Sequence, residues 1–228
     1  MADDALPELP GGPYDIEFFF DPGCPFAWQT SVWMRRVAQR RGVRVGWRFI
    51  SLQFANEGRE MPPALAQSQV RSHRYLRICA AARQRYGNET VGALYRGWGE
   101  RFWYVKGEGD FAARLEEGAR HADPVEILRS LELPSDLLDA ADDTSWDAVI
   151  RAETDEAFRR TGPDVGTPII TYDPPDGSSL FGPVLSDVPD GDEAVAIFDA
   201  LRTLARFPGF SELKRSKRPP LDLPLLAD

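Results

Sequence analysis

The residue whose chemistry stands out is Cys24, which follows a turn signal and precedes a proline. Asp21-Pro22-Gly23 ends an apolar run with turn chemistry, and Pro25 suits the first turn of a helix, where its missing N–H is not needed. The free N–H groups and the positive dipole end of a helix start stabilise a thiolate, which is the nucleophilic form of cysteine. We therefore predict a reactive thiol at Cys24, rather than the small buried residue that a cysteine often is.

A second segment with the right composition is Val165-Gly166-Thr167-Pro168, which precedes a short apolar run. If this loop faces Cys24 through a cis Thr167–Pro168 bond, the backbone groups of Thr167 are free to pair with an extended thiol substrate. The cis isomer costs little before proline, but only about one X–Pro bond in twenty is cis, so composition alone favours the trans form.

Several other side chains could take part in chemistry, each with a plainer alternative. Phe26 and Trp28 could line a substrate groove beside Cys24, although core packing suits Trp28 at least as well. The only other thiol, Cys79, lies in an apparent helix and is expected to be a buried core residue rather than a distant resolving cysteine. His73 and His121 are expected at surface or cap positions, because a thiolate at a helix start needs no base.

The elements that must position Cys24 follow from the hydrophobic pattern around it. Residues 14–20 alternate between apolar and polar side chains and predict a strand that ends just before Cys24, and residues 43–49 alternate in the same way. Between them, residues 25–41 repeat apolar side chains at helical spacing, and Gly42 is a suitable helix terminator. The first quarter of the chain is therefore predicted to be a β-α-β unit.

The rest of the chain divides into a helical middle and a mixed end. Helical patterning runs from about residue 63 to residue 161 with almost no strand signal. Short strands are predicted at residues 169–172 and from residue 179, and a last helix covers about residues 190–206.

This order of elements predicts an α/β protein with a thioredoxin fold, because β-α-β and β-β-α units are the two halves of that fold. The helical block between them is then an inserted α-helical subdomain that covers the edge of the sheet where Cys24 is expected. The predicted division of the chain is a disordered leader at 1–13, a thioredoxin-like domain formed by 14–60 and 163–213, an inserted subdomain at 61–162, and a C-terminal tail at 214–228.

The charge balance excludes some partners. Lys and Arg total 27 against 36 Asp and Glu, which gives a formal net charge of −9 and argues against general nucleic-acid binding. The one basic cluster lies near the C-terminus and is expected to be a solvated tail rather than a phosphate-binding patch; it consists of Lys214, Arg215, Lys217 and Arg218.

Other features bear on location and cofactors. No apolar run is long enough for a membrane span, and the N-terminus lacks the pattern of a secretory signal, so a cytoplasmic protein is expected. Two cysteines do not make a disulfide framework, and two histidines without nearby cysteines do not suggest a zinc or other metal site. The glycine pairs in the middle of the chain complete no phosphate loop, so no bound nucleotide or flavin is inferred.

The segment from Asp21 to Trp28 resembles the active-site segment of DsbA-family oxidoreductases, and more closely that of their mycothiol-dependent nitroreductase branch. Further stretches resemble the same branch in the same order along the chain: Ser51-Leu52 with Asn56-Glu57, residues 164–168, residues 181–186 and residues 212–215. The resemblance implies a thioredoxin fold with a helical insertion, thiol–disulfide chemistry at Cys24 and a cis-proline loop at Thr167–Pro168. It also implies mycothiol as the reducing cosubstrate, with no tightly bound cofactor. Pro25, Phe26, Trp28, Thr167 and Pro168 are the expected contacts of substrate or thiol.

One position departs from the better-studied form of that branch, which has Cys-Pro-Trp-Cys. In this chain Phe26 and Ala27 occupy the third and fourth positions, so Cys24 has no resolving partner within the motif. Exchange must then stop at a mixed disulfide until an outside thiol attacks it. We therefore predict a monothiol oxidoreductase that acts on a small-molecule or protein disulfide and is resolved by mycothiol or a similar low-molecular-weight thiol.

Two other classes of function remain open. One is a thiol S-transferase or isomerase similar to the kappa-class glutathione enzymes, in which the site residue activates a bound thiol without forming a disulfide and a serine would serve. The other is a binding module on a thioredoxin scaffold that has lost its redox function.

Overall fold

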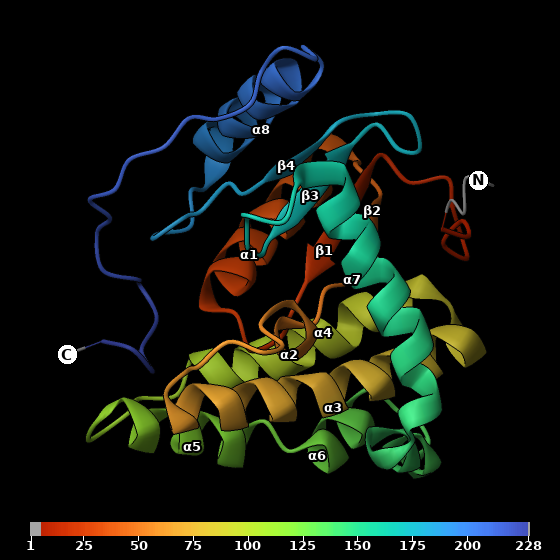
Figure 1. Ribbon diagram of the computed structural model, residues 1–228, viewed down its shortest axis with the longest axis vertical. Coiled ribbons are helices and arrows are strands. Elements are labelled where there is room, and N and C mark those ends of the chain that lie inside the picture. The colour runs from red at the N-terminus through yellow and green to blue at the C-terminus, as the bar shows by residue number, and fades with distance from the viewer. Residues whose placement is uncertain (1–5, 228) are drawn as a thin grey trace.

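The computed structural model of the chain describes residues 6–227 (Figure 1). Its centre is a four-stranded sheet in the order β2-β1-β3-β4. β1 pairs in parallel with β2, whereas β3 is antiparallel to both β1 and β4. The strands are β1 (Ile16–Phe20), β2 (Val45–Phe49), β3 (Ile169–Tyr172) and β4 (Ser179–Phe181). The predicted α/β class and thioredoxin fold are confirmed.

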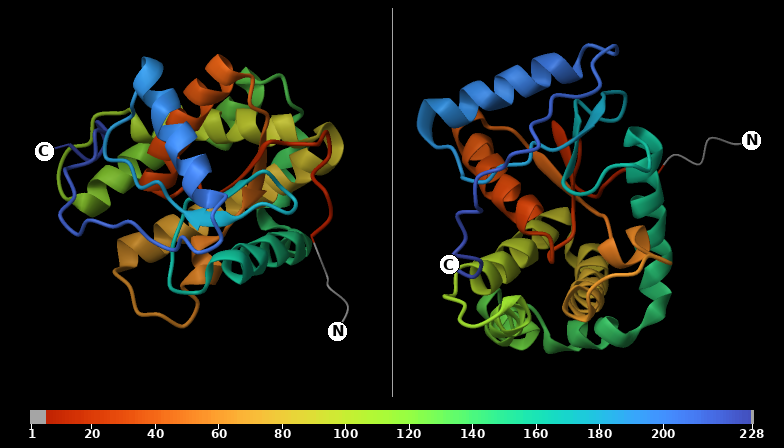
Figure 2. Two further views of the ribbon diagram at one scale, coloured as in Figure 1. Left: turned by 90° about the horizontal axis from the view of Figure 1, so that it is seen from above. Right: turned by 60° about the vertical axis from the view of Figure 1, so that its left-hand side comes forward.

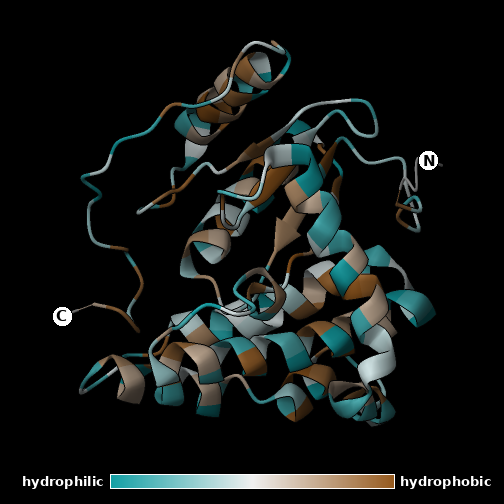
Figure 3. Cartoon of the chain, viewed as in Figure 1, coloured by the Kyte–Doolittle hydropathy of each residue, from teal (hydrophilic) through white to brown (hydrophobic). Residues whose placement is uncertain are grey.

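Helices cover both faces of this sheet. α1 (Pro25–Arg41) and α8 (Gly191–Ala205) pack together on one face, where Phe18 and Phe20 of β1 enter the main hydrophobic core. α7 (Asp147–Thr161) covers the other face, where Phe19 packs with Ala157. β1, with the sequence Ile-Glu-Phe-Phe-Phe, is brown where it is visible in Figure 3. No helix in the described part of the chain is long and apolar enough to cross a membrane.

The middle of the chain is a stack of helices below the sheet (Figure 1). α4 packs directly on β2 and on α3, so the stack and the sheet share one hydrophobic core. These helices are α3 (Pro63–Tyr86), α4 (Asn88–Trp103), α5 (Phe111–His121), α6 (Pro124–Ser130) and the short 3₁₀ helices η1 (Ser135–Asp142) and η2 (Thr144–Trp146). A one-turn helix that the hydrophobic pattern did not reveal, α2 (Leu52–Ala55), joins β2 to this stack. We retain the division at 61–162 as a proposal for the inserted subdomain.

The chain after α8 packs against the rest of the protein. It runs past α1 towards α4 (Figure 2), and Leu223 and Leu225 are both fully buried in the main core. The Leu225 N–H donates to the carbonyl of Trp103 at the end of α4 at 3.3 Å. The segment predicted as a C-terminal tail therefore ties the α1–α8 layer to the helical stack, because two leucines in it find apolar partners there. Its last residue, Asp228, lies outside the described residues.

The N-terminal segment differs in part from the predicted disordered leader. Residues 1–5 of that leader lie outside the described residues. Beyond them, Leu9 is 6% exposed and fills the space over Gly46, where a Cβ atom would come within 2.7 Å of it. The Arg44 guanidinium donates to the carbonyl of Pro13 at 2.6 Å. The missing side chain at Gly46 leaves room for this packing.

Candidate active site

Cys24 caps the N-terminus of α1, directly after the carboxyl end of β1. Its Sγ accepts a hydrogen bond from the Ala27 N–H at 3.5 Å, as expected for a residue at this position. The thiol donates to the carbonyl oxygen of Thr167, also at 3.5 Å. The Thr167–Pro168 bond is cis, the isomer implied by the family resemblance. The fold thus brings together the two segments that the sequence singled out, which are 143 residues apart in the chain.

Burial changes the predicted ionisation of Cys24. The residue is 7% exposed, and burial raises the pKa of its thiol to about 12, with the charge of Asp21 acting in the same direction and the Ala27 N–H against it. The expectation of a thiolate stabilised by the helix start is therefore wrong for this arrangement, because desolvation outweighs the N–H contact. The thiol is therefore protonated at neutral pH, and it donates this proton in the hydrogen bond to the Thr167 carbonyl.

Asp21 is a buried acid that sequence reasoning took only for a turn residue. Its side chain is fully buried and accepts hydrogen bonds from the N–H groups of Gly23 and Leu52, both at 2.7 Å. Burial raises the pKa of Asp21 to about 6, opposed by these two N–H groups and by the Ser72 hydroxyl. The carboxyl joins the loop before Cys24 to α2 and α3. An acid directly after a buried strand was the signal available in the sequence.

The electrostatic coupling of Asp21 to Cys24 gives a pH-dependent prediction. Above a pH of about 6 the Asp21 carboxyl is ionised, and its charge opposes formation of the Cys24 thiolate. Asp21→Asn removes that charge, so the pKa of Cys24 should fall and iodoacetamide should alkylate Cys24 severalfold faster at about pH 8. Below a pH of about 6, where the wild-type carboxyl is itself protonated, the two proteins should react at similar rates.

The control is Asp176→Asn, which removes the same charge from an exposed turn. It should leave the alkylation rate of Cys24 unchanged at every pH. Equal rates for Asp21→Asn and wild type above pH 7 would show that Asp21 does not influence the thiol.

The predicted aromatic contacts lie in different environments. Phe26 and Pro25, in the first turn of α1, are both half-buried. Trp28 is 1% exposed and packs edge-on against Tyr95 and Tyr104, with ring centroids 5.7 and 5.8 Å away. This placement favours core packing of Trp28, the alternative left open by the sequence, over direct contact with a substrate.

His73 is buried, so the prediction of a surface or cap position is wrong. It is 1% exposed, with Nδ1 2.9 Å from the Ser51 hydroxyl and Nε2 2.9 Å from a carboxylate oxygen of Asp147. Burial holds the pKa of His73 below its usual value, although Asp147 opposes that shift. The histidine thus connects the starts of α2 and α7 from its place in α3. Cys79 is fully buried, as predicted, and burial raises the pKa of its thiol.

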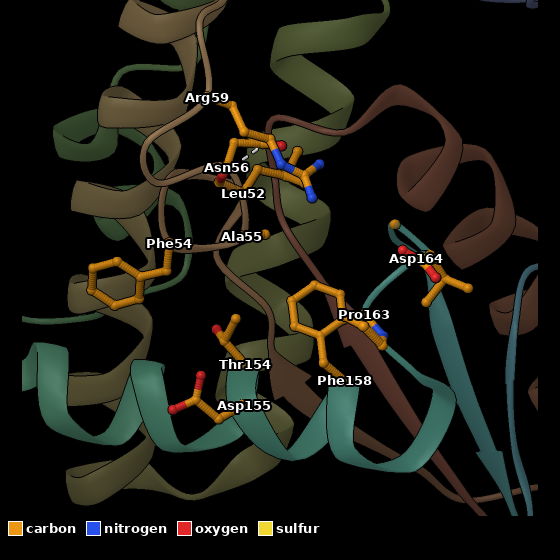
Figure 4. Close-up of a pocket in the computed structure, with 12 residues that line it drawn as sticks. Leu52, Phe54, Ala55, Asn56, Arg59, Thr154, Asp155, Phe158, Pro163 and Asp164 are labelled. Atoms are coloured by element: carbon orange, nitrogen blue, oxygen red, sulfur yellow. Dashed lines mark hydrogen bonds between the residues drawn. The ribbon is translucent and has the colours of Figure 1, made fainter.

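A cavity of about 510 Å³ adjoins the active-site loops (Figure 4). It opens between α2, the C-terminal half of α7 and the loop before Thr167. Leu52, whose N–H binds Asp21, and Gly166, the neighbour of Thr167, both line it. Its walls combine aromatic rings with polar groups: Phe54, Phe158, Asn56, Arg59, Asp155 and Asp164. Such a mixture is typical of a site for a small organic molecule.

Comparisons with known proteins give a family match along most of the chain and a match of the fold. The family model described as "Mycothiol-dependent nitroreductase Rv2466c" matches residues 23–215. The "Uncharacterized protein Rv2286c" of Mycobacterium tuberculosis is 34% identical over 218 residues, which cover 93% of this chain and 86% of that protein. The crystal structure of the probable DsbA oxidoreductase SCO1869 from Streptomyces coelicolor superposes with a TM-score of 0.52 at 15% identity. It covers 92% of this chain and 98% of that one, and at this identity it supports the fold alone.

Proposed function

The chain belongs to the family of the mycothiol-dependent nitroreductase Rv2466c, and on that premise we propose that it is a thiol–disulfide oxidoreductase acting through the single thiol of Cys24. Its partner thiol is mycothiol or a similar small thiol, and its oxidised substrate is a small-molecule or protein disulfide. The observation that supports this most strongly is the 3.5 Å contact between Cys24 Sγ and the carbonyl of Thr167. It supports the proposal because the backbone groups of Thr167, beside the proposed nucleophile, suit an extended thiol ligand.

The proposed cycle has two exchange steps. The Cys24 thiolate attacks one sulfur of the substrate disulfide, the new S–S bond forms, and the other sulfur leaves as a thiolate. The mycothiol thiolate then attacks the substrate sulfur of the mixed disulfide, and Cys24 leaves as a thiolate. Because Cys24 is 7% exposed with its thiol protonated, substrate entry must uncover it and displace its bond to Thr167.

We propose that the cavity beside the active-site loops binds the part of mycothiol other than its sulfur. Apart from its sulfur, mycothiol is a hydroxyl-rich pseudodisaccharide, and polar side chains such as Asn56 and Arg59 can hydrogen-bond its hydroxyl groups. The ring of Phe158 offers an apolar face to a sugar ring. A volume of about 510 Å³ lies within the usual range for sites of small organic ligands. A reduced small thiol as cosubstrate also agrees with the cytoplasmic location that we propose.

Introducing the missing second cysteine tests the monothiol step. In Ala27→Cys the new thiol lies three residues after Cys24 in α1, where Cα atoms are about 5 Å apart, a separation that a disulfide can span. Wild-type protein mixed with mycothiol disulfide should hold a stable one-thiol adduct. The variant should lose that adduct at least about tenfold faster, because an internal thiol resolves it without meeting a second molecule.

The matched control is Ala38→Cys, which adds a thiol to the same helix several turns from Cys24. Its adduct on Cys24 should persist as in wild type, as measured by intact mass and peptide mapping. Both lifetimes are measured without added thiol. If the wild-type adduct then decayed as fast as the Ala27→Cys adduct, the monothiol cycle would be wrong.

A further inference from the structure

One residue of the basic cluster near the C-terminus, Arg218, lies beside the first turn of α1, the helix that Cys24 caps. The guanidinium of Arg218 is 5.4 Å from the centre of the Phe26 ring, and Phe26 is two residues after Cys24. The four cluster residues lie within five positions of an otherwise acidic chain, and all of them are exposed. The sequence predicted a solvated tail at this point rather than a phosphate-binding patch.

Several contacts hold the residues directly after the cluster in place. The Ser186 hydroxyl donates to the carbonyl of Pro219 at 3.1 Å, and the Asp222 N–H donates to the Ser186 carbonyl at 2.8 Å. Gln29 of α1 donates to the Asp222 carbonyl at 3.1 Å. The buried anchors Leu223 and Leu225 follow directly. The C-terminal end of the cluster is therefore held beside the first turns of α1, where Arg218 contacts Phe26.

We propose that the oxidised substrate of Cys24 is a small anion, with a carboxylate or similar group close to its reactive sulfur, and that the segment Lys214–Arg218 recognises it. This inference rests on the proposed function and adds the charge class of its substrate. A chain with a net charge of −9 repels anions overall, so a local positive patch that reaches the first turn of α1 would decide which anions reach Cys24.

The other groups near the patch leave it positive. Glu212 lies 3.9 Å from the Lys214 ammonium and offsets one charge. Asp21 is buried, Asp222 follows the patch on the same segment, and the exposed Asp187 is next to Ser186, which bonds to Pro219. Arg218 and the half-buried face of Phe26 together offer a cation beside an apolar surface, which suits a carboxylate carried on a short carbon chain.

Three aliphatic disulfides that differ chiefly in charge provide the test: dithiodipropionate, hydroxyethyl disulfide and cystamine, which are anionic, neutral and cationic. In each reaction Cys24 Sγ bonds one sulfur and the other leaves as a thiolate, so the adduct is counted by intact mass. The rate of adduct formation is measured for wild type and for the Lys217→Glu, Arg218→Glu double variant with each probe. The variant rate divided by the wild-type rate for the same probe does not depend on how reactive that disulfide is by itself.

The matched control is Arg120→Glu, Arg129→Glu on α5 and α6, which changes the net charge equally at exposed positions of the helical stack. At low ionic strength the tail variant should react about tenfold more slowly with the anionic disulfide and faster with the cationic one, and within about twofold of wild type with the neutral one. High salt should remove the difference. The control variant should give ratios that do not differ among the three probes.

Equal ratios for the tail variant on all three probes would overturn the anion preference while leaving the proposed function intact. If none of the three disulfides forms an adduct with wild-type protein, the proposed function is itself wrong and the anion preference falls with it. The rate with the neutral disulfide also reports whether the variant retains its fold around Cys24.

Discussion

Cys24→Ser is expected to reduce mycothiol-dependent reduction of hydroxyethyl disulfide by at least about 10³-fold. A serine hydroxyl at the same helix start can still donate and accept hydrogen bonds but cannot form a disulfide. Both exchange steps of the proposed cycle require a sulfur at this position, so no partial activity should remain. The measurement is consumption of mycothiol with the disulfide in excess.

The control for this loss is Cys79→Ala, which removes the only other thiol. Cys79 is fully buried in α3, and burial keeps its pKa raised, so its removal should leave the rate within about twofold of wild type. A Cys24→Ser protein that retained activity on thiol substrates would instead favour a transferase or isomerase like the kappa-class enzymes. A wild-type protein without activity would favour the binding module.

Glu153→Gln is expected to lower the free energy of unfolding by about 3–5 kcal/mol. The Glu153 side chain is 3% exposed and pairs with Arg48 at 3.2 Å and with Arg83 at 2.9 Å. Its second oxygen accepts the Phe49 N–H at 2.7 Å. The amide keeps the size of the side chain but leaves Arg83 buried without its carboxylate, and this uncompensated charge is the main cost.

This effect is large because Glu153 joins three elements at once: α7, α3 and β2. Arg48 retains its pair with Glu17 at 2.6 Å, which limits the loss. Urea denaturation measures the change, with Glu57→Gln as the control, because Glu57 is 67% exposed and its pair with Arg151 should contribute less than about 0.5 kcal/mol. A loss below about 1 kcal/mol for Glu153→Gln would contradict the structural role assigned to this cluster.

The elements around Cys24 could be predicted because their signals are local. The helix predicted at 25–41 has the observed bounds of α1, where Pro25 starts it and Gly42 ends it in the left-handed conformation. The strands at 14–20 and 43–49 were placed to within two residues, since alternation of side chains marks a half-buried strand. The pairing of Cys24 with Thr167 followed from the order of elements together with the family resemblance.

What escaped prediction depends on contacts between distant segments. The burial that protonates Cys24 and raises the pKa of Asp21 comes from α2 and α3, which no local pattern places over the loop. His73 looks like an ordinary polar residue on a helix until Ser51 and Asp147 are brought to its two nitrogens. The packed C-terminal segment was missed because two leucines in a proline-rich stretch have no periodicity.

The most direct test of the monothiol mechanism is the intact mass of reduced protein mixed with mycothiol disulfide. The proposed function predicts one mycothiol per chain, absent in Cys24→Ser and released when free mycothiol is added. An unmodified mass for the wild-type protein, or an adduct that persists in Cys24→Ser, would contradict thiol exchange at Cys24.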